Sequence, residues 1–136
     1  MLRLEIVTPE RRMFDESVDA VEVPGFDGEL GILPGHAELL SKLKPAGILT
    51  WHKGDEVGRI YISDGFVEVG PTRVTVLADR AARPEDINLP LALRMKEQAE
   101  KALQQAITSG EVNDYTDLLE DVERATLEAQ LAELNK

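Results

Sequence analysis

The 136-residue chain contains no cysteine, and this absence removes two kinds of structure from consideration. Without thiols the protein has neither a disulfide framework nor a thiolate metal site. Histidine is nearly as scarce, since the chain has only His36 and His52. Two histidines so far apart in the sequence do not make a metal site. We therefore expect no metal ion.

Two further features are missing: a long apolar run and an excess of positive charge. No stretch approaches the roughly 20 apolar residues of a membrane-spanning helix, and no basic segment leads into an apolar one at the N-terminus. Acidic residues number 26 against 15 basic ones, for a net charge of -11. We expect no direct membrane insertion and no nucleic-acid partner, because phosphate neutralisation supplies much of the affinity for nucleic acid.

The first 84 residues have the pattern of antiparallel strands. Apolar residues alternate in short bursts, β-branched residues are frequent, and turn-forming residues separate the bursts. This pattern is typical of an antiparallel sheet, and enough segments are present for two packed layers. Turns are expected at 53–55, 63–65 and 70–72, and strands near 2–7, 11–15, 18–23, 29–32, 37–43, 47–52, 57–62, 65–69 and 73–78.

Residues 85–136 follow a helical pattern instead. Alanine, leucine and charged residues dominate, and no glycine occurs before Gly110. The short connection 109–113 predicts two antiparallel helices packed as a hairpin. The expected seam residues are Ala92, Met95, Ala99, Ala102 and Ala106 on the first helix, and Leu118, Val122, Ala125, Ala129 and Ala132 on the second.

Local signals support the expected helix boundaries. Asn88 is suited to cap the first helix, with Pro90 in its first turn, where a missing N–H is harmless. Either Asn113 or Asp114 is suited to cap the second. The sequence therefore predicts an all-β part plus an α part, namely an N-terminal antiparallel β-sandwich at 1–84 followed by a C-terminal antiparallel α-helical hairpin at 85–136.

The ten-residue run from Gly28 to Ala37 combines turn chemistry with a carboxylate and a histidine. Leu33-Pro34-Gly35-His36 predicts a type II turn, because proline presets φ at the second position and glycine accepts a positive φ at the third. Val23-Pro24-Gly25-Phe26 has the same signals and predicts another reversal. Between them, Glu29 and His36 are expected at one edge of a rigid body.

An acid–base pair of His36 with Glu29 or Asp27 is one interpretation of this edge. No serine nucleophile elbow, glycine-rich phosphate loop or HExxH motif accompanies these residues, so catalysis has little support. Exposed loops on a rigid scaffold commonly carry binding. We therefore favour a non-catalytic interface over an enzyme.

Four segments carry a resemblance to a known family. They are GELGILPGHAELL from Gly28, LKPAG from Leu43, ISDGFVEV from Ile62 and VTVLAD from Val74. Together these resemble the epsilon subunit of the F-type, proton-translocating ATP synthase, called delta in mitochondria. The resemblance implies a non-catalytic rotor subunit of the central stalk, which couples c-ring rotation driven by proton flow to ATP synthesis in the catalytic head.

The resemblance also implies partners and a location. In that family the loop carrying these motifs faces the c-ring and the sandwich packs on gamma. By resemblance, residues 1–84 form a rotor-attachment domain at the cytoplasmic face of the bacterial inner membrane, and the hairpin reaches toward the beta and alpha subunits. The implied c-ring and gamma interface comprises Glu29, Leu30, Gly31, Ile32, Pro34, Gly35 and His36. A plainer alternative stays open, in which the glycines and Pro34 serve only the turns while Leu30 and Ile32 belong to the core.

Some bacterial relatives bind ATP through a motif at the start of the hairpin, but this chain departs from it. Asn88 stands where aspartate is expected, Leu91 and Gln98 where arginines are expected, and Met95 where alanine is expected. With both cations gone, no pairing for a triphosphate is apparent. We expect no tight ATP site and no cofactor, which argues against a nucleotide sensor.

The family can also inhibit ATP hydrolysis through the second helix of the hairpin, which meets an acidic segment of beta. Residues 111–136 hold eight acidic groups and only Arg124 and Lys136 as basic ones, so electrostatic inhibition of this kind is weakened. Inhibition by this helix would then depend on its apolar residues Leu118, Leu119 and Val122, which could insert as a wedge. A different class of function also stays open, a stand-alone β-sandwich ligand-binding module with a helical tail.

Overall fold

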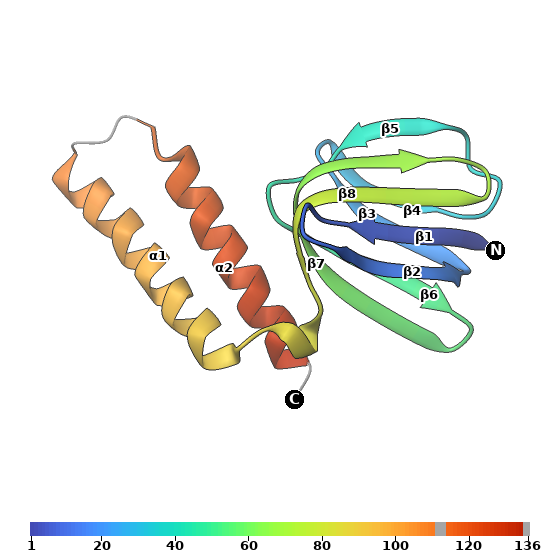
Figure 1. Ribbon diagram of the computed structural model, residues 1–136. Helices are drawn as coiled ribbons and strands as arrows, with labels where there is room; N and C mark the ends of the chain where they lie inside the picture. The colour runs from blue at the N-terminus through green and yellow to red at the C-terminus, as the bar shows by residue number, and fades with distance from the viewer. Residues whose placement is uncertain (111–113, 135–136) are drawn as a thin grey trace. The chain divides into compact units, whose positions relative to one another are not determined.

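The computed structural model describes residues 1–110 and 114–134 and separates the chain into two compact units (Figure 1). The units are Met1–Arg83, which is built of strands, and Pro84–Lys136, which is built of helices. The predicted fold class, a β-sandwich followed by a helical hairpin, is confirmed.

Eight strands make up the first unit, and they form one continuous sheet in the order β2-β1-β8-β7-β6-β3-β4, with β5 pairing to β7. All pairs are antiparallel except β1 with β8, which run parallel. The strands are β1 (Leu2–Val7), β2 (Arg12–Val18), β3 (Ala20–Gly25), β4 (Gly28–Ile32), β5 (Leu39–Lys42), β6 (Gly47–Lys53), β7 (Glu56–Val69) and β8 (Arg73–Ala82).

Strand β7 joins the two layers of the sandwich. Its first half pairs with β6 and its second half with β5, while β8 runs beside both halves. The sequence predicts a turn at Ser63-Asp64-Gly65, and that prediction is wrong. The chain bends there without reversing, with φ of 52° at Asp64 and 121° at Gly65, and the register to β8 is the same on both sides.

Glycine is required at this bend. A Cβ on Gly65 would lie 1.9 Å from the main-chain oxygen of Leu77, which no other residue could accommodate. Its φ of 121° is also outside the range that L side chains adopt readily. The glycine interpreted as ending a strand therefore lets one strand serve two layers.

Side chains alternate between the core and the surface, as a half-buried sheet requires. The inward-facing side chains of both layers pack into one cluster of buried apolar residues, listed from the chain start as Leu2, Leu4, Ile6, Met13, Phe14, Val18, Val21, Val23, Ile32, Leu43, Leu49, Ile60, Ile62, Val67, Val69, Val74, Val76 and Ala78. A rigid body of this kind can hold exposed loops in fixed positions.

Trp51, the single tryptophan, closes one side of this core. Its ring lies against Gly58, the residue opposite it on β7, and its centroid is 5.5 Å from that of Phe14. The Arg83 guanidinium lies over the Phe14 ring, 5.8 Å from its centroid, and donates a hydrogen bond to the Met13 main-chain oxygen at 2.6 Å. Arg83 thus fastens the end of the sandwich onto β2.

The second unit contains a short 3-10 helix, η1 (Pro84–Asp86), and two helices, α1 (Leu89–Ser109) and α2 (Thr116–Leu134), which pack together. The Asn88 cap is confirmed, because its Oδ1 accepts a hydrogen bond from the Leu91 N–H at 3.1 Å, and Pro90 lies in the first turn. At the start of α2, Asp114 accepts from Thr116, which holds the pKa of that carboxyl below its ordinary value. Asn113, the other predicted cap, lies outside the described residues.

The predicted seam is correct for α2 and partly wrong for α1. On α2 all five predicted residues are buried or half-buried. On α1, Met95 and Ala102 are exposed, whereas Ala99 and Leu103 are half-buried between the buried ends Ala92 and Ala106. Residues 92, 96, 99, 103 and 106 recur at spacings of four and three and form the buried or half-buried face, and Met95 and Ala102 lie beside it.

Gly58→Ala is expected to destabilise the sandwich by about 1 to 3 kcal/mol, because the added Cβ would lie 2.1 Å from the Trp51 ring. Urea unfolding followed by Trp51 fluorescence measures this change directly. Gly70→Ala is the matched control, since the nearest atom to its Cβ would be 3.7 Å away. Equal stability of the two variants would contradict the packing described for Trp51.

Candidate functional site

The predicted edge begins at the β3–β4 hairpin. The sequence predicts a reversal at Val23-Pro24-Gly25-Phe26, but Pro24 and Gly25 lie within β3 and the chain turns at Phe26 and Asp27. Proline is tolerated there because its main-chain oxygen accepts a hydrogen bond from Lys44 at 3.0 Å, on the side away from β4. The missing N–H therefore costs the sheet no hydrogen bond to β4.

The second predicted turn is confirmed. His36 N–H donates to the Leu33 oxygen at 3.2 Å, and Gly35 has φ of 85°, as the third position of a type II turn requires. The Nδ1 of His36 lies 2.7 Å from the Ala37 oxygen, which limits the ring orientation. This turn presents a fixed shape to solvent.

A second turn lies against the first. Gly35 N–H donates to the Pro71 oxygen at 2.7 Å, which joins Leu33–His36 to the β7–β8 turn at 70–72. The Arg3 N–H donates to the Thr72 main-chain oxygen at 2.9 Å, so the start of β1 is bonded to the same turn. The sequence predicts each turn separately, but no spacing in it indicates that they meet. We call residues 33–36 and 70–72 the paired turns.

The residues predicted for the interface divide between surface and core. Ile32 is 1% exposed and belongs to the core, while Leu30 is half-buried against it, as the plainer alternative expects for these two. His36 is also half-buried. Exposed to solvent are Glu29, Gly31, Pro34 and Gly35. The available surface is therefore acidic and rich in main-chain groups.

The acid–base interpretation gains nothing from the geometry. Within residues 1–110 and 114–134, neither Asp27 nor Glu29 shares a hydrogen bond with His36, and no group of three or more potential metal ligands occurs. The other histidine, His52, has its Nε2 3.2 Å from Glu22 on the neighbouring strand, where both side chains are exposed.

An exposed apolar surface, which the sequence does not indicate, lies on the outer side of β5, β7 and β8. Phe66 and Leu77 face each other across β7 and β8 and are 52% and 51% exposed. Leu40 on β5 is 69% exposed, and Lys42 stands opposite Phe66. The alternating sequence pattern predicts only that every second residue of a strand faces inward. Which outward-facing residues of different strands are neighbours depends on the strand register. We call Leu40, Phe66 and Leu77 the outer apolar face.

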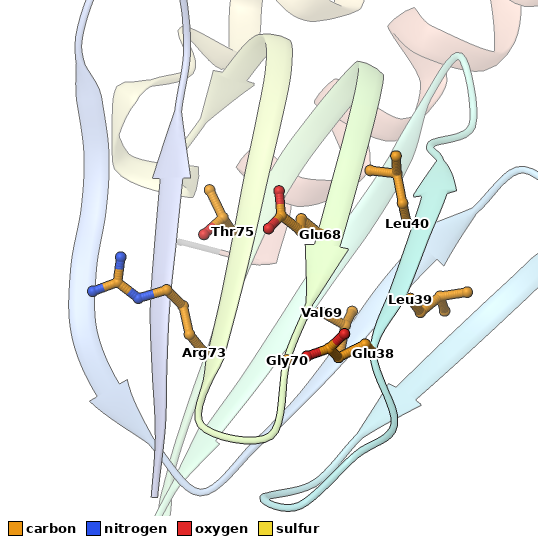
Figure 2. A pocket seen from close by; sticks show the side chains of 8 residues that line it. All are labelled: Glu38, Leu39, Leu40, Glu68, Val69, Gly70, Arg73 and Thr75. Carbon is orange, nitrogen blue, oxygen red and sulfur yellow. The ribbon is translucent and has the colours of Figure 1, made fainter.

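Beside this face, an open groove of about 470 Å³ lies between β5, β7 and β8, and Figure 2 shows the side chains that line it. Glu68, Thr75 and Glu38 are among the residues that line it. Arg73 also lines the groove, and its guanidinium binds Glu5 on β1 at 2.8 Å. The other charged residues that line the groove, Glu38 and Glu68, are carboxylates.

Further along the outer surface, ion pairs hold β1 and β2 together. Arg3 donates to Asp15 at 2.6 Å, and this hydrogen bond holds the pKa of the Asp15 carboxyl below its ordinary value. Arg12 approaches both Asp15 and Glu5. These residues use their charges within the sandwich, so they are not candidates for binding a partner.

On the helices, the structure places the remaining predicted residues one by one. Of the altered nucleotide motif, Asn88 is occupied as a helix cap, and Leu91, Met95 and Gln98 are exposed. Of the predicted regulatory residues on α2, Leu118 and Val122 are half-buried and Leu119 is 54% exposed. In the described part of the chain no helix is long and apolar enough to cross a membrane.

Comparison with known proteins agrees with the motifs at the paired turns. Residues 1–84 match the family described as "ATP synthase, Delta/Epsilon chain, beta-sandwich domain". The ATP synthase epsilon chain of Dehalococcoides mccartyi is 41% identical over 132 residues, which cover 97% of this chain and 92% of that relative. The epsilon chain of Desulforamulus reducens is 46% identical over 101 residues, covering 74% and 76%.

A solved structure agrees with the sequence matches. The mitochondrial ATP synthase of Euglena gracilis, determined with OSCP, F1 and the c-ring, contains a chain that is 25% identical and superimposes with a TM-score of 0.67. The match covers 98% of this chain and 80% of the other. The chain therefore belongs to the epsilon chains of ATP synthase, the non-catalytic subunits of the central stalk of the F-type enzyme.

Proposed function

We propose that this chain attaches the central stalk to the c-ring through the paired turns and the neighbouring strand β4, and to gamma through the outer apolar face. Attached at both places, it transmits torque between proton-driven rotation of the ring and the catalytic head. Its place is then at the cytoplasmic face of the bacterial inner membrane. Family membership sets aside the alternative of a stand-alone ligand-binding module.

One observation carries the c-ring proposal: the bond of 2.7 Å from Gly35 to Pro71 braces the turn that bears the family motif. A rigid loop transmits force without first deforming, and a braced type II turn loses little conformational entropy when a partner binds. Glu29 and Pro34 are exposed beside it and serve no packing role in the core.

The gamma proposal is supported by the outer apolar face. Three large apolar side chains exposed on adjacent strands are unusual on a free surface, and grouped exposure of this kind marks interaction sites. Phe66 is an aromatic side chain at its centre, and aromatic residues commonly anchor interfaces. The Euglena structure, which holds the F1 head and the c-ring, is the assembly in which such a contact would be found.

Replacing Glu29 or His36 by alanine should weaken ATP-driven proton pumping and retention of the c-ring in the reconstituted enzyme. The melting temperature of the free subunit should stay within about 2 °C, because neither side chain belongs to the core. Glu56→Ala and His52→Ala are the matched controls and should retain coupling. A parallel loss of coupling and melting temperature would instead assign Glu29 and His36 to shaping the loop.

For the hairpin we propose that it inhibits ATP hydrolysis only weakly, much less than a hairpin with a basic second helix would. The only basic residues in 111–136 are Arg124 and Lys136, and Arg124 binds Asp121 at 3.2 Å. Contact with beta or alpha would then depend on the exposed Leu119, with Leu118 and Val122 half-buried beside it. The exposed side chains at positions 91 and 98 supply no cation for a triphosphate.

Deleting residues 85–136 should therefore change the ATPase rate of the assembled enzyme by less than about fivefold, the lower limit of typical allosteric coupling. The full-length chain in the same preparation is the control. A sharp rise in hydrolysis after the deletion would contradict this proposal. So would calorimetric binding of ATP to the full chain with a dissociation constant below about 1 mM.

A further inference from the structure

Gly31 is a glycine that the fold itself does not need. Five of the ten glycines have a positive φ, namely Gly28, Gly35, Gly54, Gly65 and Gly110. Three more would place a Cβ within 3.0 Å of another atom, namely Gly25, Gly47 and Gly58. Gly31 and Gly70 have neither property, and of the two only Gly31 lies in a strand and would have a Cβ that meets nothing within 4 Å. Glycine weakens a strand, so its presence here indicates close approach by something outside the chain.

The main chain of β4 is open on one side. Strand β4 ends the sheet order and pairs only with β3. Pro24 stands opposite Glu29 and has no N–H, and its oxygen is bound to Lys44, so Pro24–Glu29 is a non-hydrogen-bonded pair. Because bonded pairs alternate along an antiparallel ladder, the N–H and C=O groups of Glu29 and Gly31 point away from β3.

We infer that the open edge of β4 binds an extended segment of a neighbouring rotor subunit through the main-chain groups of Glu29 and Gly31. This inference rests on the proposed attachment through β4 and the paired turns, and it specifies how that attachment is made. Strand addition at a free edge draws its affinity from main-chain hydrogen bonds, and a missing side chain at Gly31 leaves room for the approaching backbone.

Charge selects the kind of segment. Asp27 in the turn before β4 and Glu29 in β4 are exposed, and Glu38 is exposed beyond the turn at 33–36. A second copy of this chain would bring the same carboxylates against one another in an antiparallel pair, which is unfavourable. The segment that fits is therefore from a different chain and carries a basic side chain beside its extended backbone.

Amide exchange tests the pairing residue by residue. The full-length subunit is assembled with gamma and the c-ring, exposed to deuterated water, separated, and its amides are observed by NMR. We expect Glu29 and Gly31 to exchange at least about tenfold more slowly in the assembly than in the free subunit. Leu30 and Ile32, whose amides face β3, should be protected in both states.

Substitution at Gly31 provides a second test. Gly31→Ala and Gly31→Val should keep or raise the melting temperature, since each added side chain meets open space. Binding to the assembly should fall with side-chain size, by about tenfold for valine. Val57→Ala, at an exposed strand position outside every proposed surface, should bind normally.

The two proposals fail in different ways. If Glu29→Ala and His36→Ala weaken retention of the c-ring but the amides of Glu29 and Gly31 gain no protection on assembly, strand addition is wrong and attachment through β4 and the turns stands. Unchanged binding of Gly31→Val would likewise overturn strand addition. If the alanine variants retain the c-ring normally and neither amide gains protection, the attachment surface itself is wrong.

Discussion

Strand β7 passes from one layer of the sandwich to the other, and the bend at Asp64 and Gly65 makes that passage possible. Its second half carries β5, while its first half carries β6 and, through β6, strands β3 and β4. A side chain at Gly65 would collide with the main chain of β8. If the bend could not form, the strands that end at the paired turns would not be brought together.

In this geometry the two faces of β7 and β8 have different roles. Residues facing inward, such as Val67 and Val76, fill the core, and their neighbours Phe66 and Leu77 face outward. Stability and attachment therefore depend on different residues. That division explains why a change at the surface can be expected to disturb assembly without unfolding the sandwich.

How far the sequence could predict this structure differs between its parts. The strand pattern, the type II turn at Leu33–His36 and the Asn88 cap follow from local chemistry and were predictable. The sequence predicts a turn at Gly65, because a glycine after an aspartate is compatible with a chain reversal and with a bend inside one strand. Only the pairing with β8 distinguishes these two structures. The sequence likewise predicts a reversal at Pro24, because proline followed by glycine is typical of a turn, although both residues lie within β3.

The parts of the site that could not be predicted depend on contacts between distant segments. The bond from Gly35 to Pro71 joins two turns that are separated in the chain by strands β5, β6 and β7, and no local pattern indicates it. The outer apolar face appears only when the register sets Phe66 opposite Leu77. On α1, the predicted seam includes the exposed Met95 and omits the half-buried Leu103, because helical spacing alone does not show which side of the helix meets α2.

The central claim is that two separate surfaces of one rigid sandwich attach it to two partners. The most direct measurement is co-purification of gamma and the c-ring with three forms of the full chain: unchanged, Glu29→Ala, and Phe66→Ser combined with Leu77→Ser. The account predicts that the first variant loses mainly the c-ring and the second mainly gamma, with the melting temperature retained in both. Loss of both partners together from either variant, or of neither from both, would contradict it.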